Sequence, residues 1–512
     1  MKGHLYDFRC TIFIMAKRTS TIEMMLPQRE DGVSAYRWLY SSLRDEILEG
    51  RLRPGTRLPA TRDLASQYGL SRGTIVTAFE ELKAEGYVEG SVGSGTYVSK
   101  VLPEELLEVR REAARKAAAK MQPRRRFTDY GKMVQRFPNF PDRATRAFRA
   151  NIPAVDLFPM TLWAQLTNRR LRRMSMGLLT GTNALGYPPL REAIAHYAST
   201  SRGAVCTAEQ VVVLSGVQEA LDLSARLLLN PGDRVGMEEP GYFGATKVFE
   251  AIKAKIVPLA VDKEGVKLPG ARQRGMRLVY TTPAHQAPMG MTMSLPRRLA
   301  LLEWARRSGT MIFEDDYDGE YRYSGRPVPV LQGLDQHGVV LLAGSFSKVL
   351  FPSLRLGYMV VPPDLVDRFA AAKSLISRHS ALLEQTVLCD FIEQGHLGRH
   401  LRRMREVYSE RLGVLLDEGR RGLAGLLEIS EIEAGLQTVG WLRPKVNGWE
   451  AAKAAWKRGI EVISIRGLYS LDGRDGTKTA DQDGFQLGFA AIDAREIRRG
   501  VEELARVLEG MG

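Results

Sequence analysis

The stretch GSFSKVLFPSLRLGY, residues 344–358, contains a single lysine, Lys348, which follows Ser345 and Ser347 and lies seven positions before Arg355. An amine that forms a Schiff base with an aldehyde cofactor needs this kind of setting. Hydroxyl groups, backbone N–H groups and a guanidinium can hold the phosphate that such a cofactor carries. The stretch therefore indicates an anchor for pyridoxal phosphate. The alternative is a surface loop in which a lysine lies among serines.

A second stretch, MIFEDDYDGEY at residues 311–321, supports the cofactor interpretation. Its apolar lead-in is followed by the carboxylates of Glu314, Asp315, Asp316 and Asp318, with Tyr317 among them. A buried carboxylate at the end of a strand can keep a pyridine nitrogen protonated, and a neighbouring tyrosine can hydrogen-bond the ring hydroxyl. A solvated acidic turn and a divalent-metal site are the alternatives, because clustered aspartates also suit hard cations.

Further upstream, VVVLSGVQEALDLSARLLL at residues 211–229 predicts a strand, a tight turn at Ser215 and Gly216, and then an amphipathic helix. A strand that enters a helix through glycine is suited to phosphate, because the free N–H groups and the helix dipole face the anion. From Asn151 onward, helix-like and strand-like stretches alternate. This alternation predicts an α/β domain over residues 151–512.

The chain has 512 residues and a formal net charge of +14, and its length allows two to four domains. Residues 101–150 carry 13 basic and 6 acidic side chains, which is half of the excess. We interpret this segment as a basic linker, helical at its start. A basic connector suggests a polyanionic partner, although such surfaces also occur without one.

The three cysteines, Cys10, Cys206 and Cys389, are far apart, which indicates neither a disulfide framework nor a zinc site and fits the cytoplasm. No apolar run approaches 18 residues, so no membrane span is expected. Residues 1–33 contain TIFIM, which is too short for the core of a signal peptide. We expect a disordered leader or an over-extended start there.

From Ser34 the pattern becomes helical, and the turn GRLRPGTRLP separates this helix from a second one expected over residues 61–67. Ser71 can cap a third helix in SRGTIVTAFEELKAEG, and YVEGSVGSGTYVS at residues 87–99 predicts a β-hairpin. Three helices followed by a hairpin make a winged helix-turn-helix domain, which we place at residues 34–100. A small helical cap for an enzyme, with solvated arginines, is the alternative.

The order of these motifs resembles the GntR family of bacterial DNA-binding domains, over about residues 34–99. The resemblance implies that the start of the third helix enters the major groove of operator DNA. Ser71, Arg72 and Thr74 would then meet base edges or phosphates. Arg62 on the second helix would contact backbone or base, and Gly95 on the wing would approach the minor groove.

Five stretches of the C-terminal part, GVQEALDL, PGDRVGMEEPGY, TTPAHQAPMG, FEDDYDGEYRY and GSFSKVLFPSLRLGY, resemble the fold-type-I aminotransferases in their order along the chain. The sequences EDDYD and HQAP are similar to those of MocR-type regulators, in which a GntR winged helix precedes this domain. The resemblance implies that Lys348 carries the internal aldimine of pyridoxal phosphate, that Asp315 pairs with the pyridine nitrogen and that Tyr317 binds the ring oxygen.

The same resemblance assigns further cofactor contacts. The phosphate would be held by Gly216, Val217, Gln218, Ser345, Ser347 and Arg355. Tyr242 would stack on the ring. His285 and Gln286 stand near the place where aminotransferases of this fold usually have an asparagine beside the ring oxygen, although a single histidine is often only a hydrogen-bonded structural residue.

One departure from the aminotransferase pattern concerns substrate binding. Aminotransferases hold the substrate α-carboxylate with an arginine near the C-terminus, whereas FQLGFAAI at residues 485–492 has Gln486 at that place. A neutral amide cannot replace a charge-assisted bidentate clamp. Efficient turnover of amino acids is therefore not expected, although Arg466 in ISIRG is a candidate substitute.

Together these features predict a pyridoxal-phosphate-dependent, DNA-binding transcription regulator that senses an amino compound or the cofactor itself. By resemblance, a head-to-tail homodimer is expected, with no metal and no membrane partner. Two alternatives remain open at this point. One is a working aminotransferase with an accessory DNA-binding module, and the other is a repressor whose C-terminal half is only a dimerisation scaffold.

Overall fold

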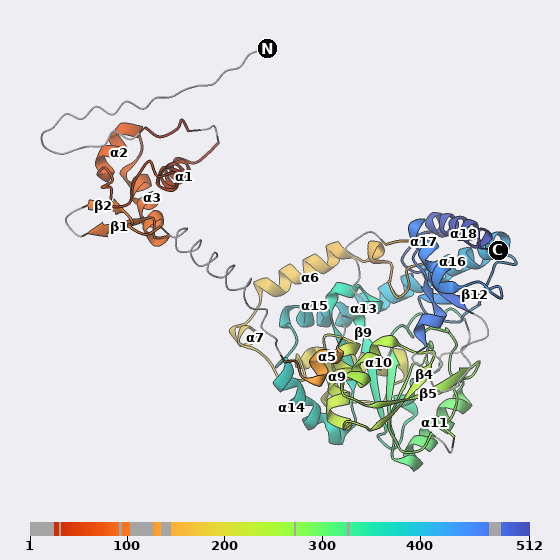
Figure 1. The fold of residues 1–512 in the computed structure, drawn as a ribbon. Helices are drawn as coiled ribbons and strands as arrows, with labels where there is room; N and C mark the ends of the chain where they lie inside the picture. The colour runs from red at the N-terminus through yellow and green to blue at the C-terminus, as the bar shows by residue number, and fades with distance from the viewer. Residues whose placement is uncertain are drawn as a thin grey trace, which may run out of the picture. The chain divides into compact units, whose positions relative to one another are not determined.

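The computed structural model describes residues 25–29, 32–91, 95–102, 126–134, 145–270, 273–324, 328–469 and 483–511. The chain divides into two compact units, Met1–Arg126 and Phe127–Gly512 (Figure 1). Most of the expected leader, residues 1–24, and most of the expected linker, residues 103–125 and 135–144, lie outside the described residues.

The N-terminal unit is a winged helix. Its elements are α1 (Ala35–Leu48), α2 (Thr61–Tyr68), α3 (Arg72–Ala84) and a hairpin of β1 (Val88–Ser91) and β2 (Gly95–Val98). Leu39, Leu43 and Ile47 lie on one face of α1 and pack against Ile75 and Phe79 of α3, because residues three and four apart share a face of a helix. Gly69 ends α2 in the left-handed conformation, with φ 62°, which turns the chain toward α3.

A sheet of eight strands organises the C-terminal unit, in the order β3-β10-β9-β8-β7-β4-β5-β6. The strands are β3 (Val211–Leu214), β4 (Arg234–Glu239), β5 (Lys255–Asp262), β6 (Gly265–Val266), β7 (Met276–Thr281), β8 (Met311–Asp316), β9 (Val340–Ser345) and β10 (Gly357–Val360). Strands β9, β8, β7, β4 and β5 are mutually parallel, whereas β10 runs antiparallel to both β3 and β9. The carboxyl ends of most strands therefore meet at one edge.

Both faces of this sheet are buried, as a predominantly parallel sheet requires. Val211 and Val213 of β3 belong to one hydrophobic core, and Val212 and Leu214 belong to another. This alternation follows from the two-residue repeat of a strand. Helices α8 (Pro188–Arg202) and α15 (Leu382–Glu393) contribute to the first core, and α9 (Val217–Leu228) and α14 (Val366–Ile376) contribute to the second.

The remaining elements connect these strands or form the C-terminal subdomain. Up to residue 349, the other helices of the C-terminal unit are α5 (Asp129–Met133), α6 (Met160–Arg172), α7 (Met176–Thr180), α10 (Phe243–Ala251), α11 (Leu295–Ser308), α12 (Leu331–Leu334) and α13 (Phe346–Val349). Short 3₁₀ turns are η1 (Val155–Leu157), η2 (Ala208–Gln210), η4 (Pro352–Leu354), η5 (Pro363–Leu365) and η6 (Ile465–Leu468).

The C-terminal subdomain has its own antiparallel sheet, in the order β11-β12-β14-β13. Its strands are β11 (Leu427–Ile429), β12 (Gln437–Leu442), β13 (Ile463–Ser464) and β14 (Gly484–Gly488), and its helices are α16 (His396–Gly422), α17 (Gly448–Lys457) and α18 (Ala494–Glu509). Helices α16, α17 and α18 lie together with β12 in the blue part of Figure 1.

The last residues of the expected linker pack into the C-terminal unit. Ala147 and Phe148 are fully buried, and Phe148 pairs with Gly488 beside β14. The apolar side chains within an arginine-rich stretch explain why this piece joins the core. Across the described residues, no helix combines the length and apolarity needed to span a bilayer.

Candidate functional site

The predicted site residues of the C-terminal unit come from loops and strand ends at the carboxyl edge of the large sheet. Asp315 lies near the end of β8, and Ser345 ends the neighbouring parallel strand β9. Lys348 follows three residues later on the short helix α13. In open α/β sheets ligands bind at this edge, since loops and helix N-termini converge there.

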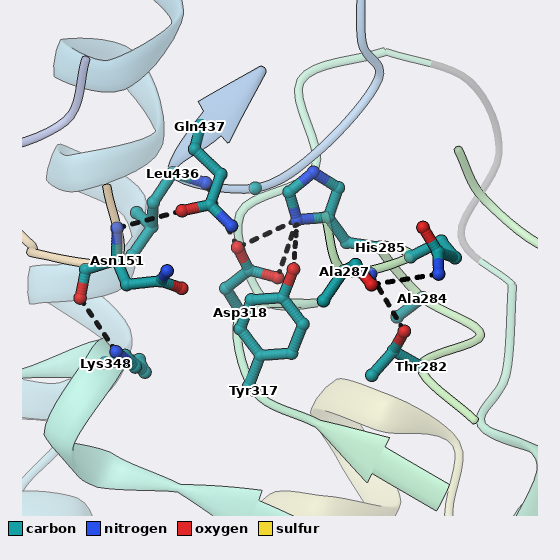
Figure 2. A network of polar contacts seen from close by, with 12 residues as sticks. Asn151, Thr282, Ala284, His285, Ala287, Tyr317, Asp318, Lys348, Leu436 and Gln437 are labelled. Carbon is teal, nitrogen blue, oxygen red and sulfur yellow. Dashed lines mark hydrogen bonds and ion pairs between the residues drawn. The ribbon is translucent and has the colours of Figure 1, made fainter. Parts of the chain in front are cut away.

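The side chain of Lys348 is partly buried, and its Nζ donates a hydrogen bond of 2.8 Å to the backbone carbonyl of Asn151 (Figure 2). Burial lowers the pKa of Lys348 to about 8, against the attraction of Asp318 and Asp315, which favours the charged form. About a tenth of this amine is therefore neutral at pH 7, a far larger share than for an ordinary lysine. A neutral lysine amine is a nucleophile for carbonyl groups.

Only one of the two oxygens of the Asp315 carboxylate is hydrogen-bonded. The Tyr280 hydroxyl donates to Oδ2 at 2.7 Å, whereas Oδ1 is buried and has no hydrogen-bond partner. Burial raises the pKa of Asp315 to about 7, opposed by the Tyr280 hydrogen bond. A buried carboxylate oxygen without a partner is rare and is suited to accept a hydrogen bond from a ligand.

Tyr317 belongs to a polar network with His285 and Asp318 (Figure 2). The Tyr317 hydroxyl lies 3.0 Å from His285 Nδ1, which is itself 2.9 Å from Asp318 Oδ2. Asp318 Oδ2 also accepts a hydrogen bond from the backbone N–H of Leu436, at 3.1 Å. Asp318 thus joins the strand β8 region to the segment that enters β12. His285 Nε2 is buried without a partner.

The carboxylates of the acidic stretch at residues 311–321 have different partners. Glu314 accepts backbone hydrogen bonds from Leu331 and Gln332, and Asp316 forms an ion pair of 2.6 Å with Arg202. In the part of the chain that the structure describes, no group of three or more His, Cys, Asp or Glu side chains is arranged to hold a metal ion.

Three of the predicted phosphate residues, Gly216, Val217 and Gln218, form the start of α9. Gly216 precedes this helix with φ 133°, and a Cβ atom at Gly216 would lie 3.6 Å from Arg355 Nη2. The N–H groups of the first helical turn, including those of Val217 and Gln218, have no partner within a helix. Ser347 Oγ is buried without a hydrogen-bond partner.

A cavity of about 680 Å³ opens beside this loop. Its lining includes Trp163, Ser215, Glu219, Phe351 and Arg355. Nearby, Gln218 Nε2 donates to the Tyr242 hydroxyl at 2.9 Å, and the rings of Tyr242 and Tyr280 are 6.4 Å apart. Burial raises the pKa of Tyr242 to about 12, so this hydroxyl stays protonated.

Three other predicted residues have different surroundings. The Gln286 amide donates to Glu238 at 3.1 Å and to the Pro240 carbonyl at 2.9 Å, so it ties the end of β7 to the loop after β4. Gln486 is buried in the middle of β14, between β12 and β13. Arg466 is exposed on η6.

Sequence patterns did not indicate several residues that complete the site. Asn151, the acceptor for Lys348, is 197 positions away from it, and the Asn151 N–H donates to Gln437 Oε1 at 2.9 Å. Tyr280 and Lys373 were likewise missed. Long-range partners of this kind leave no spacing signal, although the run of β-type residues before Thr281 marks Tyr280 as a residue near a strand end.

The predicted DNA-contacting residues lie on the winged helix. Ser71 caps α3, and its Oγ accepts the Thr74 N–H at 3.1 Å. The side chains of Arg72 and Arg62 are exposed. Gly95 begins β2 with φ 111°, and a Cβ there would lie 2.9 Å from Arg57 Nε, so a larger residue would disturb the wing.

Comparison with known families divides the chain into an N-terminal and a C-terminal part, as the two compact units do. Residues 35–98 match the family of bacterial regulatory proteins described as gntR, and residues 148–504 match aminotransferase class I and II. Among solved structures, Pyrococcus horikoshii kynurenine aminotransferase is 26% identical, with a TM-score of 0.64 over 71% of this chain and 90% of that chain. The α-aminoadipate aminotransferase LysN of Thermus thermophilus is also 26% identical, with a TM-score of 0.64 over 71% and 92%.

Curated relatives match this chain over most of their length. The probable rhizopine catabolism regulatory protein MocR of Rhizobium meliloti is 40% identical over 94% of this chain and 95% of its own. The transcriptional regulator TauR of Rhodobacter capsulatus is 33% identical over 74% and 78%. The chain therefore belongs to the MocR-type transcriptional regulators, a family in which a GntR-type winged helix precedes an aminotransferase class I and II domain.

Proposed function

We propose that this regulator holds pyridoxal phosphate at Lys348 and uses it to recognise an amino compound, which changes how its winged helix binds operator DNA. The observation that carries the proposal is the sheltered amine of Lys348 beside the carboxylates of Asp315 and Asp318, in a chain that also has a GntR-type DNA-binding domain. The proposal places the protein in the cytoplasm, where its operator lies.

The unpaired groups of the site fit this cofactor. Asp315 Oδ1 is an acceptor for a protonated ring nitrogen, and the Ser347 hydroxyl is a donor for a phosphate oxygen. Arg355 and the first turn of α9 supply positive charge and N–H groups for the same phosphate. Two structural relatives were solved with compounds of the same class, one with PMP and one with N-(5'-phosphopyridoxyl)-L-leucine.

When bound, pyridoxal phosphate supplies an aldehyde that reacts with amines and a ring that withdraws electrons. The chain's own residues set the conditions. Burial lowers the pKa of the Lys348 amine toward neutrality, and Asp315 would offer a negative charge to the ring nitrogen. The Tyr317 hydroxyl, which lies 3.0 Å from His285 Nδ1, would meet the ring oxygen. Gly216, Val217, Gln218 and Ser345 would complete the phosphate site, and Tyr242 would cover the ring.

The site favours sensing over turnover. Gln486 offers no positive charge at the place where aminotransferases bind a carboxylate, so an amino acid would be held less firmly. Gln286 is already engaged by Glu238 and Pro240. The relatives that share both domains are regulators by name.

Coupling to the winged helix would begin at Asn151. Its carbonyl accepts from Lys348 and its N–H donates to Gln437 of β12, and it lies in the segment that follows the linker. When the Lys348 amine is engaged elsewhere, Asn151 loses that donor. A ligand shifts a conformational equilibrium only through such differential contacts. In a head-to-tail homodimer, the change would alter the spacing of two winged helices on a two-part operator.

The test is fluorescence anisotropy of labelled DNA from the gene's own upstream region, titrated with the protein, pyridoxal phosphate and a panel of amines. We expect one amine class to change the affinity for DNA, and Lys348→Ala to bind DNA but to lose the response. If Lys348→Ala responds like wild type, the sensing role is wrong. Rapid steady-state transamination of common amino donors would instead support the working-aminotransferase alternative.

A further inference from the structure

An ion pair lies behind the predicted phosphate loop. Lys373 on α14 has no exposed side-chain surface, and its Nζ lies 2.9 Å from Glu219 Oε1. Ser377 Oγ also donates to that oxygen, at 3.1 Å. The other oxygen of Glu219 accepts both the N–H of Ser215, at 2.6 Å, and its hydroxyl, at 2.7 Å. Both oxygens of the Glu219 carboxylate therefore have hydrogen-bond or ion-pair partners.

This pair belongs to the same cavity as the phosphate residues. Ser215, Glu219 and Arg355 line the 680 Å³ cavity together with Ser377 and Ser380. Glu219 is the third residue of α9, so its carboxylate lies at the positive end of that helix. It holds Ser215, the residue directly before Gly216, through two hydrogen bonds.

The position of Glu219 creates an electrostatic conflict for a phosphate ligand. A carboxylate at the N-terminus of α9 competes for the helix dipole and repels a phosphate that binds there. A partly buried carboxylate is screened little by water, so the repulsion would be strong. Lys373 contributes one positive charge directly to this carboxylate, and the pair as a whole is neutral.

We propose that Lys373 is a positioning residue that offsets the charge of Glu219, so that Glu219 can fix the Ser215–Gly216 turn while the chain still prefers phosphorylated over unphosphorylated pyridoxal. The inference rests on the proposed function, because it assumes that pyridoxal phosphate binds at this turn. Lys373 itself touches Glu219, Ser377 and Ser380 and need not contact the cofactor.

The test compares the dissociation constants of pyridoxal phosphate and of pyridoxal, measured on the full chain by quenching of intrinsic fluorescence. The ratio of the two constants reports the phosphate preference alone. Lys373→Met should lower this preference about tenfold, because Glu219 is left uncompensated. Glu219→Gln should raise it, since Lys373 then adds a net positive charge. The double variant should return to near the wild-type ratio.

Opposite changes from the two single variants are the decisive result, because damage to the fold would weaken both ligands in both variants. Lys255→Met, at the exposed start of β5 and thus at the other edge of the sheet, is the control for the loss of one lysine charge. An unchanged ratio in both single variants would overturn the inference. If Lys373→Met does not fold, Glu219→Gln with an unchanged or lowered ratio overturns it equally. If wild type binds neither compound, the proposed function itself fails.

Discussion

Lys348 Nζ and the backbone carbonyl of Asn151 are joined by a hydrogen bond of 2.8 Å across 197 positions of sequence. The same peptide segment is bonded through the Asn151 N–H to Gln437 at the start of β12. The candidate reactive amine, the segment that follows the linker and the C-terminal subdomain therefore meet at one residue. A ligand that binds the amine acts directly on this junction.

The protonation of Lys348 predicts the pH dependence of cofactor attachment. Burial lowers its pKa from 10.5 to about 8 in the folded protein, so the neutral amine accumulates as the pH rises through 8. We expect the rate of attachment, followed by absorbance, to rise roughly tenfold between pH 7 and pH 9 and then to level off. An ordinary exposed lysine would instead give a rate that keeps rising past pH 10.

The same shift bears on stability. The folded chain binds fewer protons at Lys348 than the unfolded chain between about pH 8 and 10.5, so this group makes stability rise with pH in that window.

The Tyr280–Asp315 hydrogen bond predicts a graded effect on cofactor affinity. In the proposed site, Asp315→Asn would remove the negative charge that faces the ring nitrogen, and it should weaken pyridoxal phosphate binding by at least about tenfold. Tyr280→Phe removes only the donor to Oδ2 and should cost roughly threefold. Titrations followed by fluorescence quenching measure both. Tyr408→Phe, a buried tyrosine bonded to the Ala154 N–H at 2.9 Å, is the matched control and should bind as wild type does.

The close packing of Gly435 against the His285 ring predicts that a larger residue at position 435 destabilises the fold. A Cβ atom there would lie 2.1 Å from His285 Cε1, and Gly435 has φ 98°. Gly435→Ala should therefore lower the free energy of unfolding by about 3 kcal/mol, since His285 must move away from Asp318. Gly425→Ala has a similar φ of 73° but no neighbour within 4 Å, and should cost only about 1 kcal/mol. Equal losses in urea denaturation would show that His285 is not confined.

The exposure of Arg72 at the start of α3 leads us to expect that this residue contacts operator DNA. Arg72→Ala should weaken operator binding about tenfold or more, without changing the affinity for pyridoxal phosphate. Lys83→Ala removes a positive charge in the last turn of the same helix and should have a much smaller effect. Electrophoretic shifts of the upstream DNA compare the two variants. Similar binding by Arg72→Ala and wild type would contradict the placement of the start of α3 in the major groove.

The winged helix could be predicted closely because its signals are local. The second helix was expected over residues 61–67 and spans Thr61–Tyr68, and the cap at Ser71 starts α3. The hairpin likewise follows from β-prone residues on either side of glycines. Turn residues and helical spacing act within a few positions, so one sequence is enough to read them.

Much of the C-terminal site could not be predicted, because its contacts join residues that are far apart in the sequence. Lys348, Asp315 and Glu219 each stand in a local motif, but their partners Asn151, Tyr280 and Lys373 are brought to them only by the fold. Gln286 shows the same limit. Its place in the TTPAHQAPMG stretch predicts a position beside the cofactor ring, but that stretch does not indicate the hydrogen bonds of its amide to Glu238 and to the Pro240 carbonyl.

The most direct test of the account is borohydride reduction of the full chain after incubation with pyridoxal phosphate, followed by digestion and mass spectrometry. The account predicts one phosphopyridoxyl group on the peptide that contains Lys348, and its loss in Lys348→Ala. Absence of the modification from that peptide in wild type, or modification of other lysines alone, would contradict it.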